Sequence, residues 1–580
     1  MSHLRELDAL DVLTPRPSPL PVEGRGGAVR ALDLDHAHRR VHCPVHFHEN
    51  SKIGLQAGGR AIASIPTNAR RATPSPLNGE RAGVRGVKTR ASRPQTSALH
   101  SVIRHTSRIL FVALCLALLQ ITFIGTAAEA PRRPQPNIVI LLADDLGYGD
   151  LGCYGHPSIR TPNLDRMAAE GMRFTDFYSA AEVCTPSRAA LLTGRYPIRS
   201  GMCNDRFRVL RRESIGGLPD SELTLAELLK ARGYATACIG KWHLGVYSIN
   251  PAYHPRRHGF DFYLGLPHSN DMDPTPAAPK GAPARLDQDP AWWNAPLYRN
   301  EELMERPADQ TQLTRRYTEA AAQFIRDNKS RPFLLYLPHS FPHVPLFASQ
   351  KFRGQSPRGL YGDVVEELDW SVGEILKTLR AEGLERNTLV FFTSDNGPWL
   401  TQGRAGGSAG LLREGKGSTW EGGMRVPGIA WWPGSVTSGV VTRELACMMD
   451  LFTTCLKLAG GEVPADRPID GLDISPVLLG RGPSPRESFL YYRGAQLYAA
   501  RLGRFKAHFN TKSAYGPDKA QAHEPALLFD LGVDPGESFN VSTNHADVLA
   551  TIQSLVEKHR ATVTAVTNQL EEVHTPAEKP

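Results

Sequence analysis

The segment N-I-V-I-L-L-A-D-D, which begins at Asn137, constrains the fold more strongly than any other part of the 580-residue chain. Its apolar residues are continuous rather than alternating, which is typical of a parallel strand that is buried on both faces. Comparable strands are predicted at A-T-A-C-I-G, P-F-L-L-Y-L-P-H-S and T-L-V-F-F-T-S-D-N-G. A helical pattern over residues 163–171 follows the first strand. The patterns over residues 224–234, 316–326 and 364–379 each precede one of the other three strands. This alternation predicts an α/β fold with a mostly parallel central sheet flanked by helices.

The character of the sequence changes near residue 480. The stretches F-L-Y-Y-R, Q-L-Y-A-A-R-L-G-R-F-K-A-H-F and A-L-L-F-D-L predict short strands, and D-V-L-A-T-I-Q-S-L-V-E-K-H-R predicts an amphipathic helix. We therefore predict a large domain over residues 137–480 and a smaller α+β domain with an antiparallel sheet over residues 481–566. Residues 567–580 are polar and are predicted to form a flexible tail.

The N-terminal part predicts export rather than a folded domain. Residues 1–103 are rich in Pro, Arg and Gly and have no helical or strand period, so we interpret them as a disordered leader or a reading frame assigned too far upstream. Residues 104–130 combine an arginine flank, an uncharged apolar run at 109–128 and the small-residue site A-E-A, as a secretory signal peptide does. An uncleaved membrane anchor is the alternative. Either interpretation predicts a periplasmic or secreted protein.

The charge distribution argues against a nucleic-acid partner. The formal net charge is +8, but this surplus falls within residues 1–130, and the rest of the chain is balanced. We therefore expect no nucleic-acid partner, and a membrane contact only if the 109–128 segment is not cleaved. Six cysteines follow residue 130 without a C-x-x-C pair, and the pattern assigns no disulfides among them.

Oxygen-bearing side chains follow two of the predicted strands. Asp144 and Asp145 follow the first strand, and Asp395 and Asn396 follow a later one. Functional groups gather at the carboxyl ends of parallel strands. Carboxylate and amide oxygens without a supporting His or Cys pair suit a hard cation such as Ca²⁺ or Mg²⁺. One Asp pair alone would be better explained by a helix cap or a turn, whereas two such clusters favour a metal site.

Cys184 opens a predicted helix in V-C-T-P-S-R-A-A-L-L-T-G-R. Pro186 suits the first helical turn, and Gly194 is placed to end the helix. The thiol therefore lies where backbone N–H groups and the helix dipole favour an anion, and Arg188 follows one turn along. The pattern leaves three roles open for Cys184: a structural residue, a thiolate nucleophile or the precursor of another group.

Lysine and histidine side chains lie close to the other predicted strand ends. Lys241 and His243 alternate along the chain, so they can point to the same side, but taken alone the pair is better explained by a solvated lysine and a histidine with satisfied hydrogen bonds. L-P-H-S-F-P-H-V-P contains His339 and His343, and nothing intrinsic separates the two. Lys416 lies in G-K-G-S-T-W-E-G-G-M-R-V-P, which lacks the spacing of a phosphate-binding P-loop.

Together these motifs resemble the type I sulfatases, the arylsulfatase family within the alkaline-phosphatase-like superfamily. The resemblance rests on C-T-P-S-R-A-A-L-L-T-G-R, N-I-V-I-L-L-A-D-D-L-G-Y-G-D, G-K-W-H-L-G, H-G-F-D-F-Y-L-G, S-D-N-G, G-K-G-S-T-W-E-G-G-M-R-V-P and D-G-L-D-I-S-P-V-L-L-G. It covers roughly residues 137–540, and C-x-P-S-R is a very specific signature. The stretches R-F-T-D-F-Y, L-P-H-S-N-D-M and F-K-A-H-F are most similar to arylsulfatase A and N-acetylgalactosamine-6-sulfatase.

The resemblance implies that Cys184 is oxidised to Cα-formylglycine by a separate formylglycine-generating enzyme that reads C-x-P-S-R in the unfolded chain. The hydrated aldehyde is a diol, of which one hydroxyl attacks sulfur and the other expels sulfate. The resemblance also implies that Asp144, Asp145, Asp395, Asn396 and residue 184 bind a cation, usually Ca²⁺, with Mg²⁺ as the alternative.

The same resemblance assigns catalytic roles to neighbouring side chains. Arg188 and Lys241 would orient the diol and balance charge, and His243 would be the base for the second hydroxyl. His343 and Lys416 would contact the sulfate and protonate the leaving oxygen.

The implied activity is hydrolysis of sulfate monoesters, of a sulfated carbohydrate or an aryl sulfate, with a sulfolipid as a further alternative. Ser269, in P-H-S-N-D, lines up with a sulfate-contacting serine, whereas His339 falls outside the motif and is interpreted as a structural residue or as a support for a neighbouring site residue. Trp292 and Trp293 would either stack on a sugar ring or pack under a loop. The alternatives to a sulfatase are a phosphomonoesterase or phosphodiesterase of the same superfamily and a non-catalytic binder of sulfated glycans.

Overall fold

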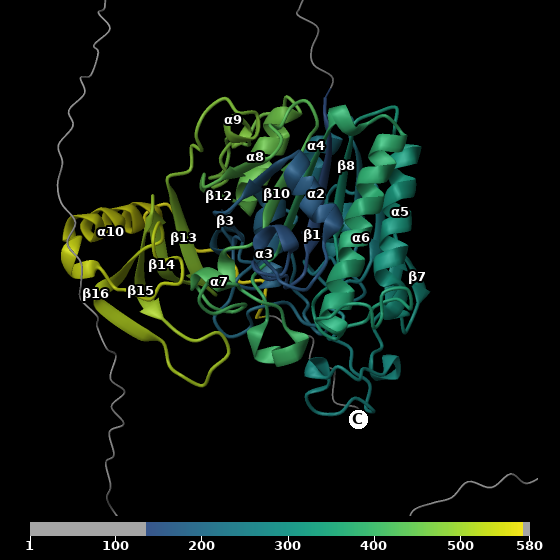
Figure 1. The fold of residues 1–580 in the computed structure, drawn as a ribbon, viewed down its shortest axis with the longest axis horizontal. Coiled ribbons are helices and arrows are strands. Elements are labelled where there is room, and N and C mark those ends of the chain that lie inside the picture. Colours follow the sequence, from purple (N-terminus) through teal and green to yellow (C-terminus); the bar gives the residue numbers. More distant parts are fainter. Residues whose placement is uncertain (1–134, 572–580) are drawn as a thin grey trace, which may run out of the picture. The chain divides into compact units, whose positions relative to one another are not determined.

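The computed structural model describes residues 135–571 of the chain (Figure 1). The predicted leader over residues 1–103 and the predicted signal peptide or anchor over residues 104–130 lie outside the described residues. Within residues 135–571, no helix combines the length and the apolar character that crossing a membrane requires. The described residues begin just before the first predicted strand, which starts at Asn137.

A ten-stranded sheet forms the centre of the described chain, in the order β11-β2-β10-β9-β1-β8-β4-β5-β6-β7. The strands from β9 to β5 run parallel, which confirms the predicted α/β fold with a mostly parallel sheet. The strands are β1 (Asn137–Ala143), β2 (Met172–Phe174), β4 (Ala235–Ile239), β5 (Phe262–Gly265), β6 (Leu297–Arg299), β7 (Glu302–Glu305), β8 (Phe333–Pro338), β9 (Thr388–Ser394), β10 (Gly428–Trp431) and β11 (Val440–Thr442). A separate pair consists of β3 (Phe177–Tyr178) and β12 (Ala446–Cys447).

Strand β1 sends its side chains alternately into two hydrophobic cores, which explains its continuous apolar sequence. Ile138, Ile140 and Leu142 pack on one face of the sheet, and Val139 and Leu141 pack on the other. Each buried side chain of this size contributes about 1.5–3 kcal/mol to folding. Helices α3, α4 and α8 cover the first face and α2, α5 and α6 the second (Figure 1). The helices are α2 (Pro162–Glu170), α3 (Cys184–Thr193), α4 (Leu225–Lys230), α5 (Leu313–Asp327), α6 (Leu360–Ala381), α7 (Glu421–Met424), α8 (Met448–Leu458) and α9 (Ser475–Leu478).

Antiparallel strands border the parallel part of the sheet on both sides, a feature that the sequence pattern did not predict. β10 pairs antiparallel with β9 and β2, and β6 pairs antiparallel with β5 and β7. The sequence G-I-A-W of β10 is as continuously buried as that of a parallel strand. Composition therefore reports the burial of β10 but not its direction, which depends on the path of the chain before it.

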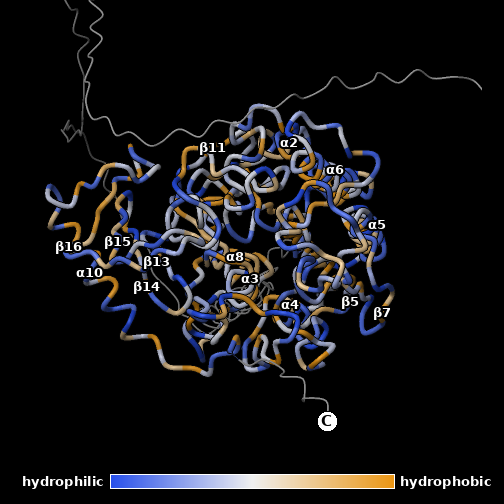
Figure 2. The backbone as a smooth tube through the Cα atoms, turned by 90° about the horizontal axis from the view of Figure 1, so that it is seen from below, coloured by the Kyte–Doolittle hydropathy of each residue, from blue (hydrophilic) through white to orange (hydrophobic). Residues whose placement is uncertain are grey.

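A four-stranded antiparallel sheet in the order β13-β14-β15-β16 forms the C-terminal part, as predicted. Helix α10 packs on this sheet through Leu549, Ile552 and Val556, which share a core with the strand residues Ala499 and Ala507. Figure 2 shows both hydrophilic and hydrophobic stretches along α10, as an amphipathic helix has. The elements are β13 (Ser488–Arg493), β14 (Gln496–Leu502), β15 (Phe505–Thr511), β16 (Gln521–Asp530) and α10 (Ala546–Arg560).

The described start of the predicted flexible tail is fixed to the central part of the protein, which corrects that prediction for residues 567–571. The backbone N–H of Gln569 donates to the Gly201 carbonyl at 2.9 Å, and Asn568 Nδ2 donates to the Cys203 carbonyl at 2.7 Å. Leu570 is 1% exposed and joins the core beneath α3 and α8. Leu570 is the one apolar residue among residues 567–571, so the polar composition of this segment did not predict its burial.

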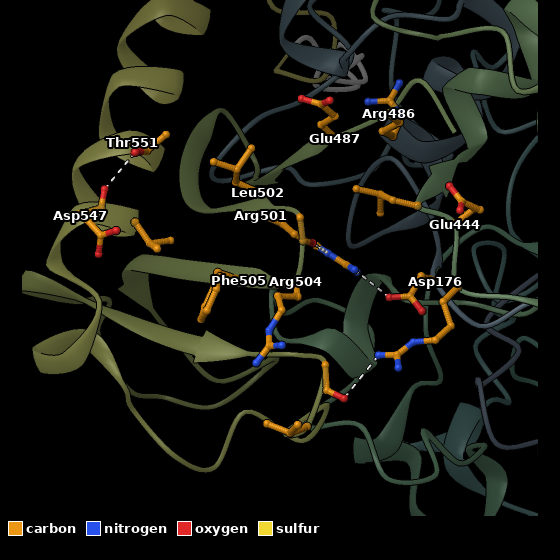
Figure 3. Close-up of a pocket in the computed structure, with 16 residues that line it drawn as sticks. Asp176, Glu444, Arg486, Glu487, Arg501, Leu502, Arg504, Phe505, Asp547 and Thr551 are labelled. Carbon is orange, nitrogen blue, oxygen red and sulfur yellow. Dashed lines mark hydrogen bonds and ion pairs between the residues drawn. The ribbon is translucent and has the colours of Figure 1, made fainter. Parts of the chain in front are cut away.

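Six buried ionised side chains join the C-terminal sheet to the central sheet, and we call them the joint cluster. They are Asp176, Glu421, Glu537, Arg425, Arg501 and Lys506. Lys506 Nζ lies 3.0 Å from Glu421 Oε1 and 2.9 Å from Glu537 Oε1. Figure 3 shows Arg501 reaching Asp176, whose Oδ1 lies 2.8 Å from Arg501 Nη2, at the wall of a cavity of about 970 Å³. The two sheets are therefore held together by buried charge as well as by packing.

Candidate active site

The carboxyl ends of β1 and β9 bring the two predicted oxygen clusters together. These strands are adjacent and parallel, so Asp144 and Asp145 leave the sheet beside Asp395 and Asn396. The Asp145 backbone N–H donates to Asp395 Oδ1 at 3.1 Å, and Asn396 Nδ2 donates to Asp145 Oδ1 at 2.7 Å. All four side chains are buried. The parallel topology thus assembles one oxygen-rich centre from segments about 250 residues apart, as expected for strand ends.

Two fully buried cations, Arg188 and Lys241, lie against these carboxylates. Lys241 follows β4, and its Nζ donates to Asp144 Oδ2 at 2.6 Å. Arg188 projects from α3, where its Nε donates to Asp395 Oδ2 at 2.9 Å and its Nη1 donates to the Lys241 carbonyl at 2.8 Å. The guanidinium therefore ties helix α3 to the ends of β4 and β9.

A second group of side chains surrounds Asp145. Lys416 Nζ donates to Asp145 Oδ2 at 2.8 Å, and His343 Nε2 lies 3.6 Å from the same oxygen. Ser269 Oγ lies 3.3 Å from the His343 ring and accepts from Lys241 Nζ at 3.2 Å. Burial, together with the Lys416 charge, lowers the pKa of His343 to about 4. Its Nδ1 contacts a backbone carbonyl at 2.5 Å, so the neutral ring carries its proton on Nδ1.

We call the ionised side chains of this region the site cluster: Asp144, Asp145, Asp395, Arg188, Lys241 and Lys416. None of the six is more than 4% exposed. Burial and the Asp144 charge raise the pKa of Asp395, although Arg188 opposes them. Buried ion pairs are weak sources of stability because both partners lose their hydration. Charge alone therefore does not explain why these six side chains are buried together, and buried groups with shifted pKa values are candidates for a functional site.

Two oxygens at the site cluster lack a hydrogen-bond partner. Asp144 Oδ1 and Asn396 Oδ1 are buried and accept no hydrogen bond in the part of the chain that the structure describes. An unsatisfied buried oxygen costs about 1–3 kcal/mol, so a ligand that binds oxygen would be stabilised there. Ligand atoms of Asp144, Asp145 and His343 lie within 4.8 Å of one another. Because the orphaned atoms are oxygens of a carboxylate and an amide, the site fits a hard cation such as Ca²⁺ or Mg²⁺.

Helix α3 begins at Cys184 and ends at Gly194, which caps it with a φ of 70°. The Cys184 side chain is 2% exposed. Burial raises the pKa of the Cys184 thiol and outweighs Lys241 and Lys416, which favour the thiolate. At neutral pH the residue is therefore a neutral thiol, and the geometry does not support a thiolate nucleophile.

His243 presents one free ring nitrogen within the buried site. Its Nε2 lies 2.8 Å from the Leu210 carbonyl, so Nε2 donates and Nδ1 carries the lone pair. Nδ1 has no hydrogen-bond partner among residues 135–571. Burial and the Lys241 charge lower the pKa of His243 well below its ordinary value, so the ring is neutral. His243 and Asp145 both adopt a positive φ, 62° and 66°, a strained conformation that is concentrated at functional sites.

Three residues considered from the sequence do not join the site cluster. His339 Nε2 lies 3.4 Å from Ser371 Oγ instead. Trp293 is 2% exposed and belongs to the core beneath the sheet, and Trp292 packs against the same core. Packing, not stacking on a sugar, therefore accounts for Trp293. The six cysteines among the described residues are all free thiols.

Two aromatic residues at the site were missed from the sequence. The Trp399 ring centroid lies 4.3 Å from Lys416 Nζ and 5.5 Å from the centroid of the His343 ring. Tyr515 lies 5.4 Å from Trp399, centroid to centroid. Trp399 follows S-D-N-G-P closely enough for that motif to have indicated it, but no pattern in the sequence links Tyr515 to the site.

Comparisons with known proteins agree with this geometry. Residues 136–461 match the family model described as Sulfatase, and residues 484–580 match the C-terminal region of aryl-sulfatase. The chain is 46% identical to arylsulfatase A of Bos taurus over 440 residues, which cover 72% of this chain and 84% of that protein. It is 43% identical to N-acetylgalactosamine-6-sulfatase of Canis lupus familiaris over 476 residues, 77% of this chain and 90% of that protein. The crystal structure of PsFucS1 sulfatase from Pseudoalteromonas sp. superposes with a TM-score of 0.66 at 29% identity, covering 74% of this chain and 92% of that chain.

Proposed function

The chain belongs to the sulfatase family and is a sulfuric ester hydrolase, and we propose that it cleaves sulfate monoesters of carbohydrates or aryl alcohols with residue 184 as the nucleophile. One observation carries the proposal. Cys184 opens α3, and Arg188, one turn along, contacts both Asp144 and Asp395. A sulfate at this helix start would meet backbone N–H groups and a fixed positive charge.

We assign Asp144, Asp145, Asp395, Asn396 and residue 184 as the ligands of a divalent cation, Ca²⁺ or Mg²⁺. The unpartnered oxygens on Asp144 and Asn396 support this assignment. When bound, the cation would supply positive charge to a sulfate oxygen and favour ionisation of a neighbouring hydroxyl.

In this proposal residue 184 is Cα-formylglycine, which a formylglycine-generating enzyme produces from Cys184 before the chain folds. The hydrated aldehyde carries two hydroxyls on one carbon. One forms a bond to sulfur as the alcohol leaves, and the other, once deprotonated, restores the aldehyde and releases sulfate. A serine has only the first hydroxyl, so it would form the adduct without releasing it.

The neighbouring side chains would hold charge and move protons. His243, neutral with its lone pair on Nδ1, would take the proton of the second hydroxyl. Lys416 and His343 would both contact the sulfate, and the pair would protonate the leaving oxygen with Lys416 as the donor, because the neutral His343 ring holds its proton on Nδ1. Arg188 and Lys241 would orient the hydroxyls of residue 184 through the contacts that already fix them to the carboxylates.

The remaining parts of the proposal concern the substrate and the setting. Ser269, held between Lys241 and His343, would contact the sulfate. Residues 137–480 would form the catalytic domain and residues 481–566 a supporting domain. The protein would be exported to the periplasm or the medium, anchored to a membrane only if the 109–128 segment stays uncleaved, and would act on a sulfated small molecule or glycan.

The test uses protein produced together with a formylglycine-generating enzyme. We expect the peptide that spans residue 184 to carry an aldehyde by mass spectrometry, and the protein to hydrolyse an aryl sulfate faster than the matching phosphate monoester. Cys184→Ser should lose multiple turnover and accumulate a sulfated form. Sustained turnover by Cys184→Ser, or a preference for the phosphate ester, would overturn the proposal.

A further inference from the structure

A second cavity, of about 380 Å³, lies beside the turn that carries Lys416. Its walls are basic and aromatic, and the side chains that matter here are Asp205, Arg208, Arg493, Tyr498, Lys512 and Tyr515. Arg208, Arg493 and Lys512 thus face a single carboxylate, Asp205, in the lining of the cavity. In the site cluster, by contrast, three cations are matched by three carboxylates. This surplus of positive charge distinguishes the cavity from the adjoining active site.

The cavity shares a wall with the candidate active site. The Gly417 carbonyl accepts from Arg208 Nη2 at 3.0 Å and from Arg493 Nη1 at 2.6 Å. The Gly417 N–H donates to the Glu182 carbonyl at 2.8 Å, two residues before Cys184 in the chain. A single turn of backbone therefore lies between the cavity and the segment that carries the nucleophile.

Aromatic rings connect the two regions along the surface. Tyr515 is 42% exposed, and its ring centroid lies 5.6 Å from the guanidinium carbon of Arg208. Tyr515 also contacts Trp399, which lies against Lys416 of the site cluster. Flat aromatic faces of this kind bury apolar surface against a ring and suit a sugar that spans the two regions.

Arg493 carries a buried charge without a carboxylate partner. It is 8% exposed, and its three hydrogen bonds in the described part of the chain all go to backbone carbonyls. A guanidinium has five N–H groups, so two remain for a ligand. Burial and the neighbouring Arg208 lower the pKa of Arg493, in keeping with a positive charge that Glu182 offsets only in part. The carboxylate that acts on the Arg493 charge is Glu182, and it is already paired with Arg208 at 2.8 Å.

We propose that this cavity binds a second anionic group of the substrate, a sulfate or a carboxylate on the sugar next to the one that carries the scissile sulfate. The inference rests on the proposed function, because it needs a sulfate ester seated at residue 184. Arg493 and Lys512 would hold the oxyanion through charge-assisted hydrogen bonds, and Tyr515 would pack against the sugar ring. The chain is then selective for glycans with two neighbouring anionic groups.

The experiment measures steady-state kinetics of the matured full chain on an aryl sulfate and on three sulfated disaccharides. The disaccharides differ only in the neighbouring sugar, which is neutral, carboxylated or sulfated. We expect KM to be about tenfold lower for the charged disaccharides than for the neutral one, as one charge-assisted contact allows. Added salt should shrink this preference.

Two matched variants locate the effect. Lys512→Gln removes a cavity cation that makes no hydrogen bond or ion pair within residues 135–571, and it should reduce the preference about threefold, as loss of a partly screened charge does. Lys519→Gln removes an exposed lysine of the same loop that does not line the cavity, and it should leave the preference unchanged.

A preference for either charged disaccharide that falls in Lys512→Gln supports the proposal and identifies the anion. Equal KM values for the three disaccharides, or an equal loss in Lys512→Gln and Lys519→Gln, would overturn it. Failure of the proposed function has a different signature, because the aryl sulfate would then also resist hydrolysis.

Discussion

The site cluster and the joint cluster each bury three carboxylates against three cations, but they satisfy their polar atoms differently. In the joint cluster, no buried nitrogen or oxygen of the six side chains lacks a hydrogen-bond partner within residues 135–571. At the site cluster, Asp144 Oδ1 and the adjacent Asn396 Oδ1 have none. Equal charge balance therefore does not imply an equal role: the satisfied cluster holds two sheets together, whereas the unsatisfied one is prepared for a ligand.

The two clusters are connected through the turn that carries Lys416. Lys506 of the joint cluster donates to the Thr419 carbonyl at 2.8 Å, and Glu537 Oε2 accepts from the Glu421 backbone N–H at 2.6 Å. The joint cluster thus fixes the backbone that places one member of the site cluster. Substitutions in the site cluster should mainly reduce activity, and substitutions in the joint cluster should mainly reduce stability.

The largest effect is expected in the site cluster. Asp144→Asn should lower kcat/KM by about 10³-fold, because electrostatic groups at a reacting centre contribute on this scale. Its unfolding free energy should fall by no more than about 1–2 kcal/mol, because the substitution also removes an unpartnered buried oxygen and the repulsion between Asp144 and Asp395, which offset the counter-charge that Lys241 loses. Aryl sulfate kinetics and urea denaturation measure the two quantities, and a larger loss of stability than of activity would contradict the comparison.

The joint cluster should show the opposite pattern. Glu421→Gln leaves Lys506 and Arg425 without a full counter-charge, so it should reduce the unfolding free energy by about 3–5 kcal/mol. Burial disfavours ionisation of Glu421, but these cations outweigh it and hold its pKa below the ordinary 4.5.

A group with a lowered pKa stabilises the folded state above its unfolded pKa and loses that contribution as the pH falls. The difference in unfolding free energy between the wild type and Glu421→Gln should therefore be largest above about pH 4.5 and shrink below it. Denaturation at pH 7 and pH 4 measures this change. A difference that grows on acidification would show that the carboxylate does not stabilise the joint.

Removal of the proposed cation should have an intermediate effect on stability. A ligand present at 100 times its Kd stabilises the folded state by about 2.7 kcal/mol, so chelation should lower the melting temperature of wild-type protein, and Ca²⁺ or Mg²⁺ should restore it. Asn396→Ala removes one unpartnered oxygen and should weaken the response. Equal responses in both proteins would place the cation elsewhere.

The smallest effect is expected for an exposed ion pair on α5. Arg315 and Glu319 lie 2.8 Å apart with side chains 47% and 59% exposed. Replacing Arg315 by Gln should change the unfolding free energy by about 0.3–0.5 kcal/mol, because solvent screens the pair. A loss as large as that of Glu421→Gln would show that burial does not distinguish these ion pairs.

Much of the site could be predicted because its residues lie at the ends of recognisable elements. Asp144 and Asp145 end a strand whose apolar run is unambiguous, and Cys184 and Gly194 mark the two ends of a helix. Parallel strands place their carboxyl ends at one edge, so proximity follows from the pattern alone. The resemblance to sulfatases added roles to these residues, and it alone indicated that Ser269 and Lys416 belong to the site.

The parts that could not be predicted depend on contacts between distant segments. Lys506 and Glu421 are 85 residues apart, and nothing in the sequence near either one indicates an ionised partner. Leu570 is a single apolar residue in a polar segment, which periodicity cannot detect. Tyr515 reaches Trp399 from a loop of the C-terminal part, so only the assembled fold shows that it borders the site.

The deep burial of Cys184 has a consequence for the order of events during synthesis. A thiol that is 2% exposed in the folded protein is out of reach of a modifying enzyme, so the proposed conversion of Cys184 would have to precede folding. The bracing of the Lys416 turn needs Glu537, which leaves the ribosome roughly 350 residues after Cys184, or about 20–70 s later at ordinary translation rates. The late position of that glutamate in the chain would therefore give the proposed maturation enzyme a time window before the Lys416 turn is fixed.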